Sequence, residues 1–308
     1  MTTYSPGVST ATFYERSNHH LASLRARADA LQASISTGQK LTKGSDDPIA
    51  AARLRLLGRA DASALIDTSL SAAATTDLSL TDDTLTSFGD AVIRIKELAV
   101  QAANGSTAPA QRTVIAAEID QIRDTLFQMA NASDSTGHAL FGGENTGAAY
   151  TLSAGGLPVY VGTAAASDVP LGDGQTVTRG ITGPQFLNFS VNGSPADLFA
   201  VAKTLSDALK GAVADPAQAA RDSLGSLDAG LEAISTQQTV VGARLNWLDL
   251  TTQRREQTGL LRSQDEADTG GTDLSLAVST LQQTMTVLEA SQASFARLSQ
   301  LSLFALLR

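Results

Sequence analysis

Apolar residues at heptad spacing near both ends of this 308-residue chain constrain its fold more than any other feature. The C-terminal stripe consists of Leu274, Val278, Leu281, Met285, Leu288 and Phe295. The N-terminal stripe consists of Leu21, Leu24, Ala28, Leu31 and Ile35. Spacings that alternate between three and four residues are typical of a coiled-coil seam. Because an apolar stripe must be buried, we expect each terminal helix to pack against the other terminus, against a neighbouring subunit, or against both.

Two more helical segments are predicted in the first half of the chain. Gly38 supplies a stop for the first helix, and Asp47 followed by Pro48 has the N-cap and first-turn chemistry that starts the next one. Apolar spacing then continues to about Asn104, which indicates one long helix or two stacked ones. A further amphipathic helix is expected from Pro109 onward.

Helix is predicted again in the second half of the chain. It resumes at about Pro195, and Asp215 with Pro216 restarts it by the same cap chemistry. The Gly270-Gly271 pair then breaks this long helix, and Asp273 can cap the C-terminal helix that follows.

The segment 137–195 differs in composition from both halves. It contains 12 of the 25 glycines and 4 of the 8 prolines, but only four charged side chains. Short β-prone runs occur at 158–161 and 175–178, and the Gly-Asp-Gly sequence at 172–174 is a turn signal. We therefore expect a small β-rich domain inserted between helices.

The expected fold class is mainly α with this small β-rich insertion, organised as a long helical coiled-coil bundle formed by the N- and C-terminal regions. The expected domains are an N-terminal coiled-coil arm and loop (1–47), a helical domain in two parts (48–136 and 196–268), the inserted domain (137–195) and a C-terminal coiled-coil arm (269–308).

Composition argues against several classes of function. The chain has no cysteine, so disulfides, Fe–S clusters and thiol catalysis are excluded, and its three histidines, His19, His20 and His138, make no His-rich metal centre. With 31 acidic and 22 basic side chains the net charge is −9, which argues against a general nucleic-acid binder. No run of apolar residues is long enough to span a membrane, and Met1–Gly7 lacks the basic and apolar regions of a cleaved secretory signal.

No motif predicts catalytic, cofactor-binding or metal-binding residues. The adjacent pair Asp82-Asp83 would not face each other on a helix and is interpreted as solvated, and Asp46-Asp47 is interpreted as a helix cap. The glycine-rich stretch 142–147 lacks the spacing of a dinucleotide site. An enzyme or a carbohydrate-binding protein on this scaffold would require an organised polar pocket.

Three groups of short stretches follow one another in a characteristic order. They are Ser36–Lys40 with Ser45-Asp46-Asp47-Pro48; then 96–105, 131–137 and 140–143; and finally 292–297 with Leu301–Phe304. In order and spacing they resemble the flagellin superfamily over roughly residues 8–145 and 195–308. Flagellins usually have alanine where this chain has Pro48, so Pro48 favours the hook-associated branch of that superfamily.

The resemblance implies a structural component of the bacterial flagellum, an adaptor at the hook–filament junction whose terminal helices form a coiled coil in an axial assembly. The implied partners are the first hook-associated protein, flagellin, further copies of the chain in a ring, and an export chaperone on the C-terminal stripe. The implied location is extracellular, reached through the flagellar type III channel. A flagellin-type filament subunit is the alternative, against which Pro48 and Leu301–Phe304 count.

Overall fold

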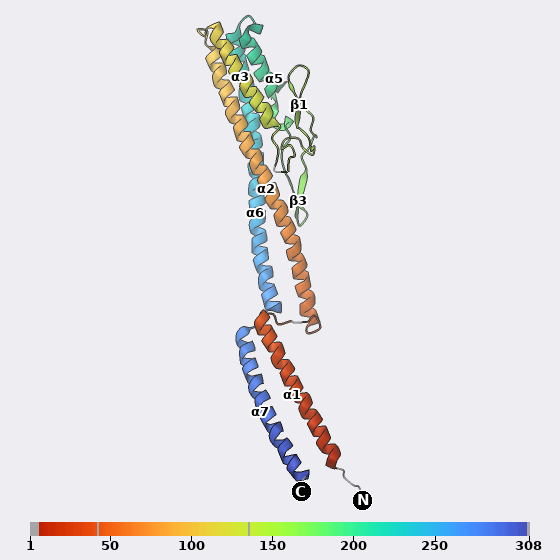
Figure 1. The fold of residues 1–308 in the computed structure, drawn as a ribbon. Coiled ribbons are helices and arrows are strands. Elements are labelled where there is room, and N and C mark those ends of the chain that lie inside the picture. Colours follow the sequence, from red (N-terminus) through yellow and green to blue (C-terminus); the bar gives the residue numbers. More distant parts are fainter. Residues whose placement is uncertain (1–5, 42, 135, 307–308) are drawn as a thin grey trace. The chain divides into compact units, whose positions relative to one another are not determined.

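The computed structural model describes residues 6–41, 43–134 and 136–306 and is mainly helical (Figure 1). The predicted mainly α class with a small β-rich insertion is confirmed. The chain divides into two compact units. We call residues 1–62 with 257–308 the arm unit, and residues 63–256 the middle unit. The expectation about Met1–Gly7 falls mostly outside the described residues.

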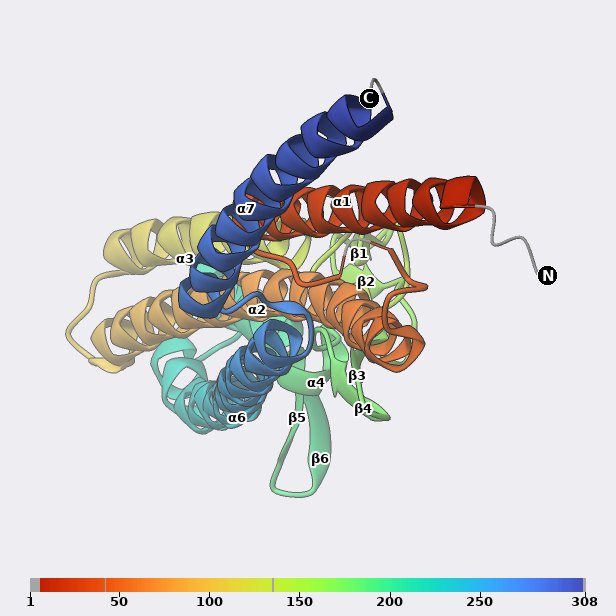
Figure 2. The same ribbon diagram turned by 90° about the horizontal axis from the view of Figure 1, so that it is seen from below.

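The arm unit is built from both ends of the chain. Helix α1 (Pro6–Thr37) packs against helix α7 (Leu274–Leu306), as Figures 1 and 2 show from two directions. The unit also contains the beginning of α2 (Pro48–Ala103) and the end of α6 (Pro216–Gly270). Two ion pairs of 2.6 Å, Arg53–Asp265 and Arg262–Asp61, join these two helix ends.

The middle unit contains the remaining helices. Segments of α2 and α6 form it together with α3 (Pro109–Ala130), α5 (Leu198–Asp207) and a short π-helical turn, η1 (Ala208–Ala212). The segment from Pro48 to Ala103 is one helix, which decides between the two interpretations that the sequence allowed. The sequence does not predict this π turn, inside which Gly211 leaves the helical conformation with a φ of 101°.

The insertion forms three separate two-stranded antiparallel sheets. The pairs are β1 (Tyr150–Leu152) with β2 (Pro158–Tyr160), β3 (Asp168–Gly172) with β4 (Gln175–Thr178), and β5 (Asn188–Val191) with β6 (Ser194–Asp197), the last pair preceded by α4 (Pro184–Leu187). Positive φ angles at residues 172–174 confirm the predicted turn. The helix expected from about Pro195 begins instead at Leu198, because residues 194–197 pair with β5.

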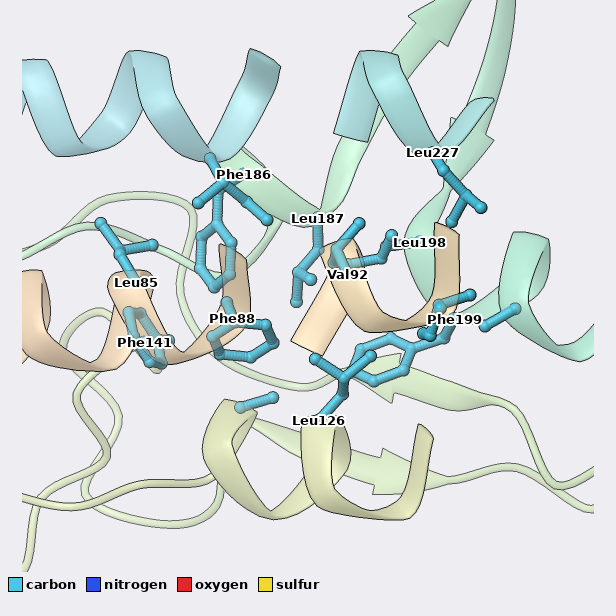
Figure 3. Close-up of a cluster of buried hydrophobic side chains, with 14 of the residues drawn as sticks. Leu85, Phe88, Val92, Leu126, Phe141, Phe186, Leu187, Leu198, Phe199 and Leu227 are labelled. Carbon is cyan, nitrogen blue, oxygen red and sulfur yellow. The ribbon is translucent and has the colours of Figure 1, made fainter. Parts of the chain in front are cut away.

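Phenylalanine rings anchor the core of the middle unit (Figure 3). Phe88 of α2 contacts Phe141 and Phe186 with ring centroids 6.1 and 5.0 Å apart, and Phe141 and Phe186 are 4.9 Å apart. Each such pair contributes about 1 kcal/mol beyond the burial of its surface. The insertion is therefore part of the core, since two of the three rings come from it or its borders.

Aspartate side chains cap the helices where the sequence predicts them. The Asp47 carboxylate accepts hydrogen bonds from the N–H groups of Ile49 and Ala50 at 3.1 and 3.0 Å. Asp215 and Asp273 accept equivalent bonds at the starts of α6 and α7. These bonds satisfy N–H groups that the first turn of a helix leaves without a partner.

Candidate assembly surface

The contact between α1 and α7 buries small side chains at its centre. Ala28 and Ser34 of α1 are buried, and so are Ala277, Thr284 and Leu288 of α7. Towards the ends of the pair, the ring of Tyr14 meets the ring of Phe295 edge to face, with centroids 5.4 Å apart. Small residues at the centre of the contact allow the two helix backbones to approach closely.

The structure divides the predicted seam residues into two sets. Leu288 is buried, with 7% of its surface exposed, and Leu21, Leu24, Leu31, Ile35, Leu281 and Phe295 are half-buried. Leu274, Val278 and Met285 are exposed. A helical spacing of 100° per residue places these three along one flank of the α1 contact. Their proposed role in assembly remains a prediction.

A second exposed apolar stripe on α7 was not singled out from the sequence. It consists of Leu276, Val287 and Leu298, which are spaced by 11 residues and therefore share one face. Val287 and Leu298 line a groove of about 560 Å³ whose other wall includes Phe13 and His20 of α1. An 11-residue spacing in the sequence was the signal that could have identified it. Helix α7 thus has exposed apolar residues on both sides of its contact with α1.

The connectors between arms and longer helices bind to each other. The N–H of Lys40 donates to the carbonyl of Gly270 at 2.7 Å, and the N–H of Thr272 donates to the carbonyl of Gly38 at 2.9 Å. Gly271 is required here, because a Cβ at this position would lie 2.3 Å from the carbonyl oxygen of Ala267. Two backbone hydrogen bonds therefore hold the loop after α1 against the loop before α7.

The motif Ser45-Asp46-Asp47-Pro48 forms the turn and cap that begin α2. The Asp46 carboxylate accepts a hydrogen bond from the N–H of Lys43 at 2.8 Å, and Asp47 caps the helix as described above. Pro48 is the first helical residue, where its missing N–H costs nothing. Ser45 is exposed. The motif thus has a structural explanation within one copy.

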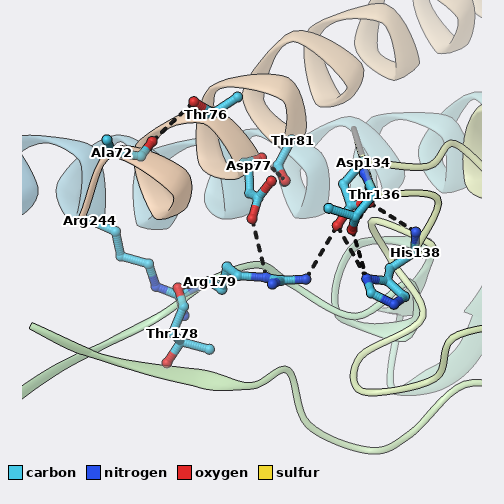
Figure 4. Close-up of polar contacts among 10 residues, drawn as sticks. All are labelled: Ala72, Thr76, Asp77, Thr81, Asp134, Thr136, His138, Thr178, Arg179 and Arg244. Atoms are coloured by element: carbon cyan, nitrogen blue, oxygen red, sulfur yellow. Dashed lines mark hydrogen bonds and ion pairs between the residues drawn. The ribbon is translucent and has the colours of Figure 1, made fainter. Parts of the chain in front are cut away.

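A polar cluster in the middle unit fastens the insertion to α2 (Figure 4). The Arg179 guanidinium contacts the Asp77 carboxylate at 3.2 Å and the Asp134 carboxylate at 3.3 Å. Burial raises the pKa of Asp77. Burial would also raise the pKa of Asp134, but hydrogen bonds from Thr136 and from the N–H of His138 outweigh it, so this pKa lies below its ordinary value.

This cluster leaves little room for a ligand. The adjoining cavity measures about 20 Å³, which suits at most one water molecule. Arg244 of α6 reaches the same region, donating to the carbonyl of Gly180 at 2.7 Å, and burial lowers its pKa. No local sequence signal predicts this contact, because Asp77 and Arg179 are about 100 residues apart.

An enzyme or a carbohydrate-binding protein would need an organised polar pocket, and the middle unit has a cavity of about 900 Å³. It is bordered mostly by apolar side chains, and its two carboxylates already have local roles. Asp197 caps α5 by accepting from the N–H of Ala200, and Asp222 accepts from the Gln218 side chain at 2.7 Å. Burial raises the pKa of Asp197. Both carboxylates of this cavity are therefore engaged in the local fold.

The described residues form neither a metal-binding group nor a membrane-spanning helix. Among the described residues, no three His, Cys, Asp or Glu side chains are grouped so that they could bind a metal ion. Within the same part of the chain, no helix combines the length and apolar character needed to cross a membrane. His19 and His20 lie exposed on α1. Of the pair predicted to be solvated, Asp83 is exposed on α2, whereas Asp82 is half-buried.

Known proteins similar to this chain include flagellar hook-associated protein 3 of Escherichia coli, which is 27% identical over 97% of this chain and 98% of the relative. Flagellar hook-associated protein 3 of Salmonella typhimurium is also 27% identical, over 98% of this chain and 99% of the relative. The family model of the bacterial flagellin N-terminal helical region matches residues 8–146.

Solved structures agree with this likeness. A candidate flagellar hook-associated protein from Vibrio parahaemolyticus is 25% identical, and it superimposes with a TM-score of 0.68 over 73% of this chain and all of the other. Xanthomonas campestris FlgL, at 18% identity, shares the fold with a TM-score of 0.61 over 68% of this chain and 99% of its own. Residues 8–146 thus match the bacterial flagellin N-terminal helical region, and the chain resembles flagellar hook-associated protein 3 over nearly its whole length.

Proposed function

We propose that this chain is a structural component of the bacterial flagellum that acts as the adaptor between hook and filament. The observation that carries the proposal is the resemblance to flagellar hook-associated protein 3, which extends over nearly the full length of both chains. A structural role agrees with a middle unit whose polar clusters are engaged in holding the fold together.

The exposed apolar residues on both flanks of α7 support assembly through the arms. In a single copy Leu276 is 66% exposed, and Leu274 and Leu298 are about half exposed. Large apolar side chains gathered on one helix favour burial against a partner. We infer that neighbouring copies in a ring, the first hook-associated protein and flagellin cover these flanks.

An export chaperone is the partner we propose for α7 before assembly. The helix presents apolar residues to solvent along much of its described length, and a helical partner could bind them in a groove. We further propose export through the flagellar type III channel to the cell exterior. The absence of cysteine suits passage of an unfolded chain, since no disulfide can form and block unfolding.

We also propose that assembly uses the chain in five functional parts. These are an N-terminal arm and loop (1–47), two helical parts (48–136 and 196–268), the insertion (137–195) and a C-terminal arm (269–308). In this scheme the arms make the axial contacts, and the helical parts with the insertion form the body of the adaptor.

Immunogold electron microscopy of intact flagella, with an antibody to this chain, tests the proposal. We expect one labelled band at the distal end of the hook. Label along the whole filament would instead assign the chain as a filament subunit. Flagella without label, in cells that express the chain, would refute a structural role in the flagellum.

A further inference from the structure

Helix α2 exposes a basic patch within the arm unit. The patch consists of Arg55, Leu56 and Arg59, all of which are exposed. Arg55 and Arg59 are four residues apart and so lie on one face of the helix. Within the part of the chain that the structure describes, neither arginine has an ion-pair partner, whereas neighbouring Arg53 binds Asp265.

The same helix exposes an acidic patch within the middle unit. This patch consists of Leu80, Asp83 and Asp90, and all three side chains are exposed. Asp83 and Asp90 are seven residues apart and share a face. Neither carboxylate has an ion-pair partner among the described residues. Arg94, the basic residue that follows them on the helix, binds Glu97 and Glu118 at 2.9 and 2.7 Å.

The two patches are complementary in composition. Each combines two unpaired charges of one sign with an exposed leucine beside them. Charge is also distributed unevenly over the units: the arm unit has 11 basic and 10 acidic residues, while the middle unit has 11 basic and 21 acidic residues. The arm unit of one copy is therefore attracted to the middle unit of another rather than repelled by it.

We propose that the basic patch of one copy binds the acidic patch of a second copy. The contact is heterologous, because different surfaces of the two copies meet, so it adds copies in one direction and does not close a two-fold dimer. Leu56 and Leu80 exclude water beside the charges, and the charges fix the register. This contact rests on the proposed function in one respect, because it requires several copies of the chain to lie side by side in the flagellum.

Engineered cysteines test the contact in intact flagella, since the chain has no cysteine of its own. Ala52→Cys lies beside the basic patch and Ser87→Cys beside the acidic patch, and both positions are exposed. Mild oxidation of flagella from cells with the double variant is expected to give crosslinked dimers and longer ladders of this chain on an immunoblot. Ala52→Cys combined with Ala154→Cys, an exposed position in the turn between β1 and β2, is the matched control and should give none.

Charge reversal supplies an independent readout on the same crosslink. Arg55→Glu with Arg59→Glu should abolish the dimer, and so should Asp83→Lys with Asp90→Lys, because like charges then meet. All four reversals together should restore it. Glu144→Lys with Glu232→Lys changes the net charge as much as the aspartate reversals but at exposed sites elsewhere, and should leave the crosslink unchanged.

The outcomes separate this contact from the wider function. Flagella that contain the chain but yield no dimer, or a four-fold reversal that fails to restore it, would overturn the proposed contact and leave the junction role standing. If the chain is missing from flagella, the junction role is refuted. The contact is then tested by oxidation of the purified full-length double variant, where a crosslinked dimer supports it and its absence refutes it. A product crosslinked to a different protein would also overturn it.

Discussion

The arm unit and the middle unit are built from similar helices but are stabilised differently. In the middle unit large side chains such as Phe88, Phe141 and Phe186 are fully buried. Among the arm-unit residues whose side chains the structure describes, the buried apolar ones are Ala28, Ala51, Ala277 and Leu288, and each retains some exposure. Because burial of apolar area provides most of the free energy of folding, the middle unit is expected to be stable alone, and the arms to gain their stability from partners.

The strongest test of this contrast removes an aromatic ring from the middle unit. Phe88→Ala deletes the ring that contacts both Phe141 and Phe186. We expect the free energy of unfolding of the middle unit to fall by about 4 kcal/mol, as is typical of a buried phenylalanine. Urea denaturation followed by circular dichroism measures it. Phe13→Ala in the arm unit, at a half-exposed position, should change it by much less; equal losses would contradict the contrast.

A charge in the α1–α7 contact is expected to act on the arms alone. Leu288→Asp places a carboxylate at a buried position in this contact and should weaken the pairing of α1 with α7 by about 3 kcal/mol. Hydrogen exchange read by mass spectrometry should then show fast exchange in α1 and α7 and unchanged protection around Phe88. Loss of protection in the middle unit would show that the two units unfold together.

Leu276→Asp is the companion variant that separates pairing from assembly. Leu276 is exposed in one copy and lies away from the centre of the α1 contact. Exchange in α1 should therefore stay as it is in the unmodified chain, while incorporation into flagella is lost.

The parts of the fold that depend on local chemistry were predictable from sequence. The caps at Asp47, Asp215 and Asp273 follow from hydrogen bonds that span three residues. The start of α5 was misplaced because pairing of Ser194–Asp197 with β5 depends on a partner strand, which periodicity along one segment does not report.

The same reasoning explains the candidate surface. Heptad spacing identified large residues such as Leu288, but Ala277 and Thr284 occupy the centre of the same contact and carry little hydropathy signal. Which apolar residues of α7 remain exposed depends on where α1 lies across it. The exposed set therefore depends on how the two ends of the chain pair, which the sequence of either end alone does not report.

The Asp134 cluster predicts a pH dependence confined to the middle unit. The pKa of the Asp134 carboxyl is lower in the folded chain than the unfolded value of about 3.9. The ionised carboxylate therefore stabilises the fold above that pH. This contribution is lost as the pH falls through the folded pKa. Asp134→Asn should cost about 2 kcal/mol at neutral pH and flatten the acid limb of the stability curve. Asp173→Asn, in the exposed turn after β3, should do neither.

The smallest expected effect is a gain of stability when the Tyr150 hydroxyl is removed from the tightly packed middle unit. The Tyr150 hydroxyl is buried and has no hydrogen-bond partner among the described residues, and it lies so close to Gly183 that a Cβ there would be 2.2 Å from its oxygen. Burying a hydroxyl without a partner is unfavourable, so Tyr150→Phe should raise the free energy of unfolding by about 1 kcal/mol.

Tyr160 is the matched control, because its hydroxyl donates to the carbonyl of Thr163 at 2.7 Å. Tyr160→Phe should therefore lower the free energy of unfolding by about 1 kcal/mol. The two rings are neighbours, with centroids 5.2 Å apart, so the same deletion is compared in one setting. A loss of stability in both variants would mean that the Tyr150 hydroxyl is satisfied in solution, and that the middle unit is less tightly packed around Gly183 than its buried rings indicate.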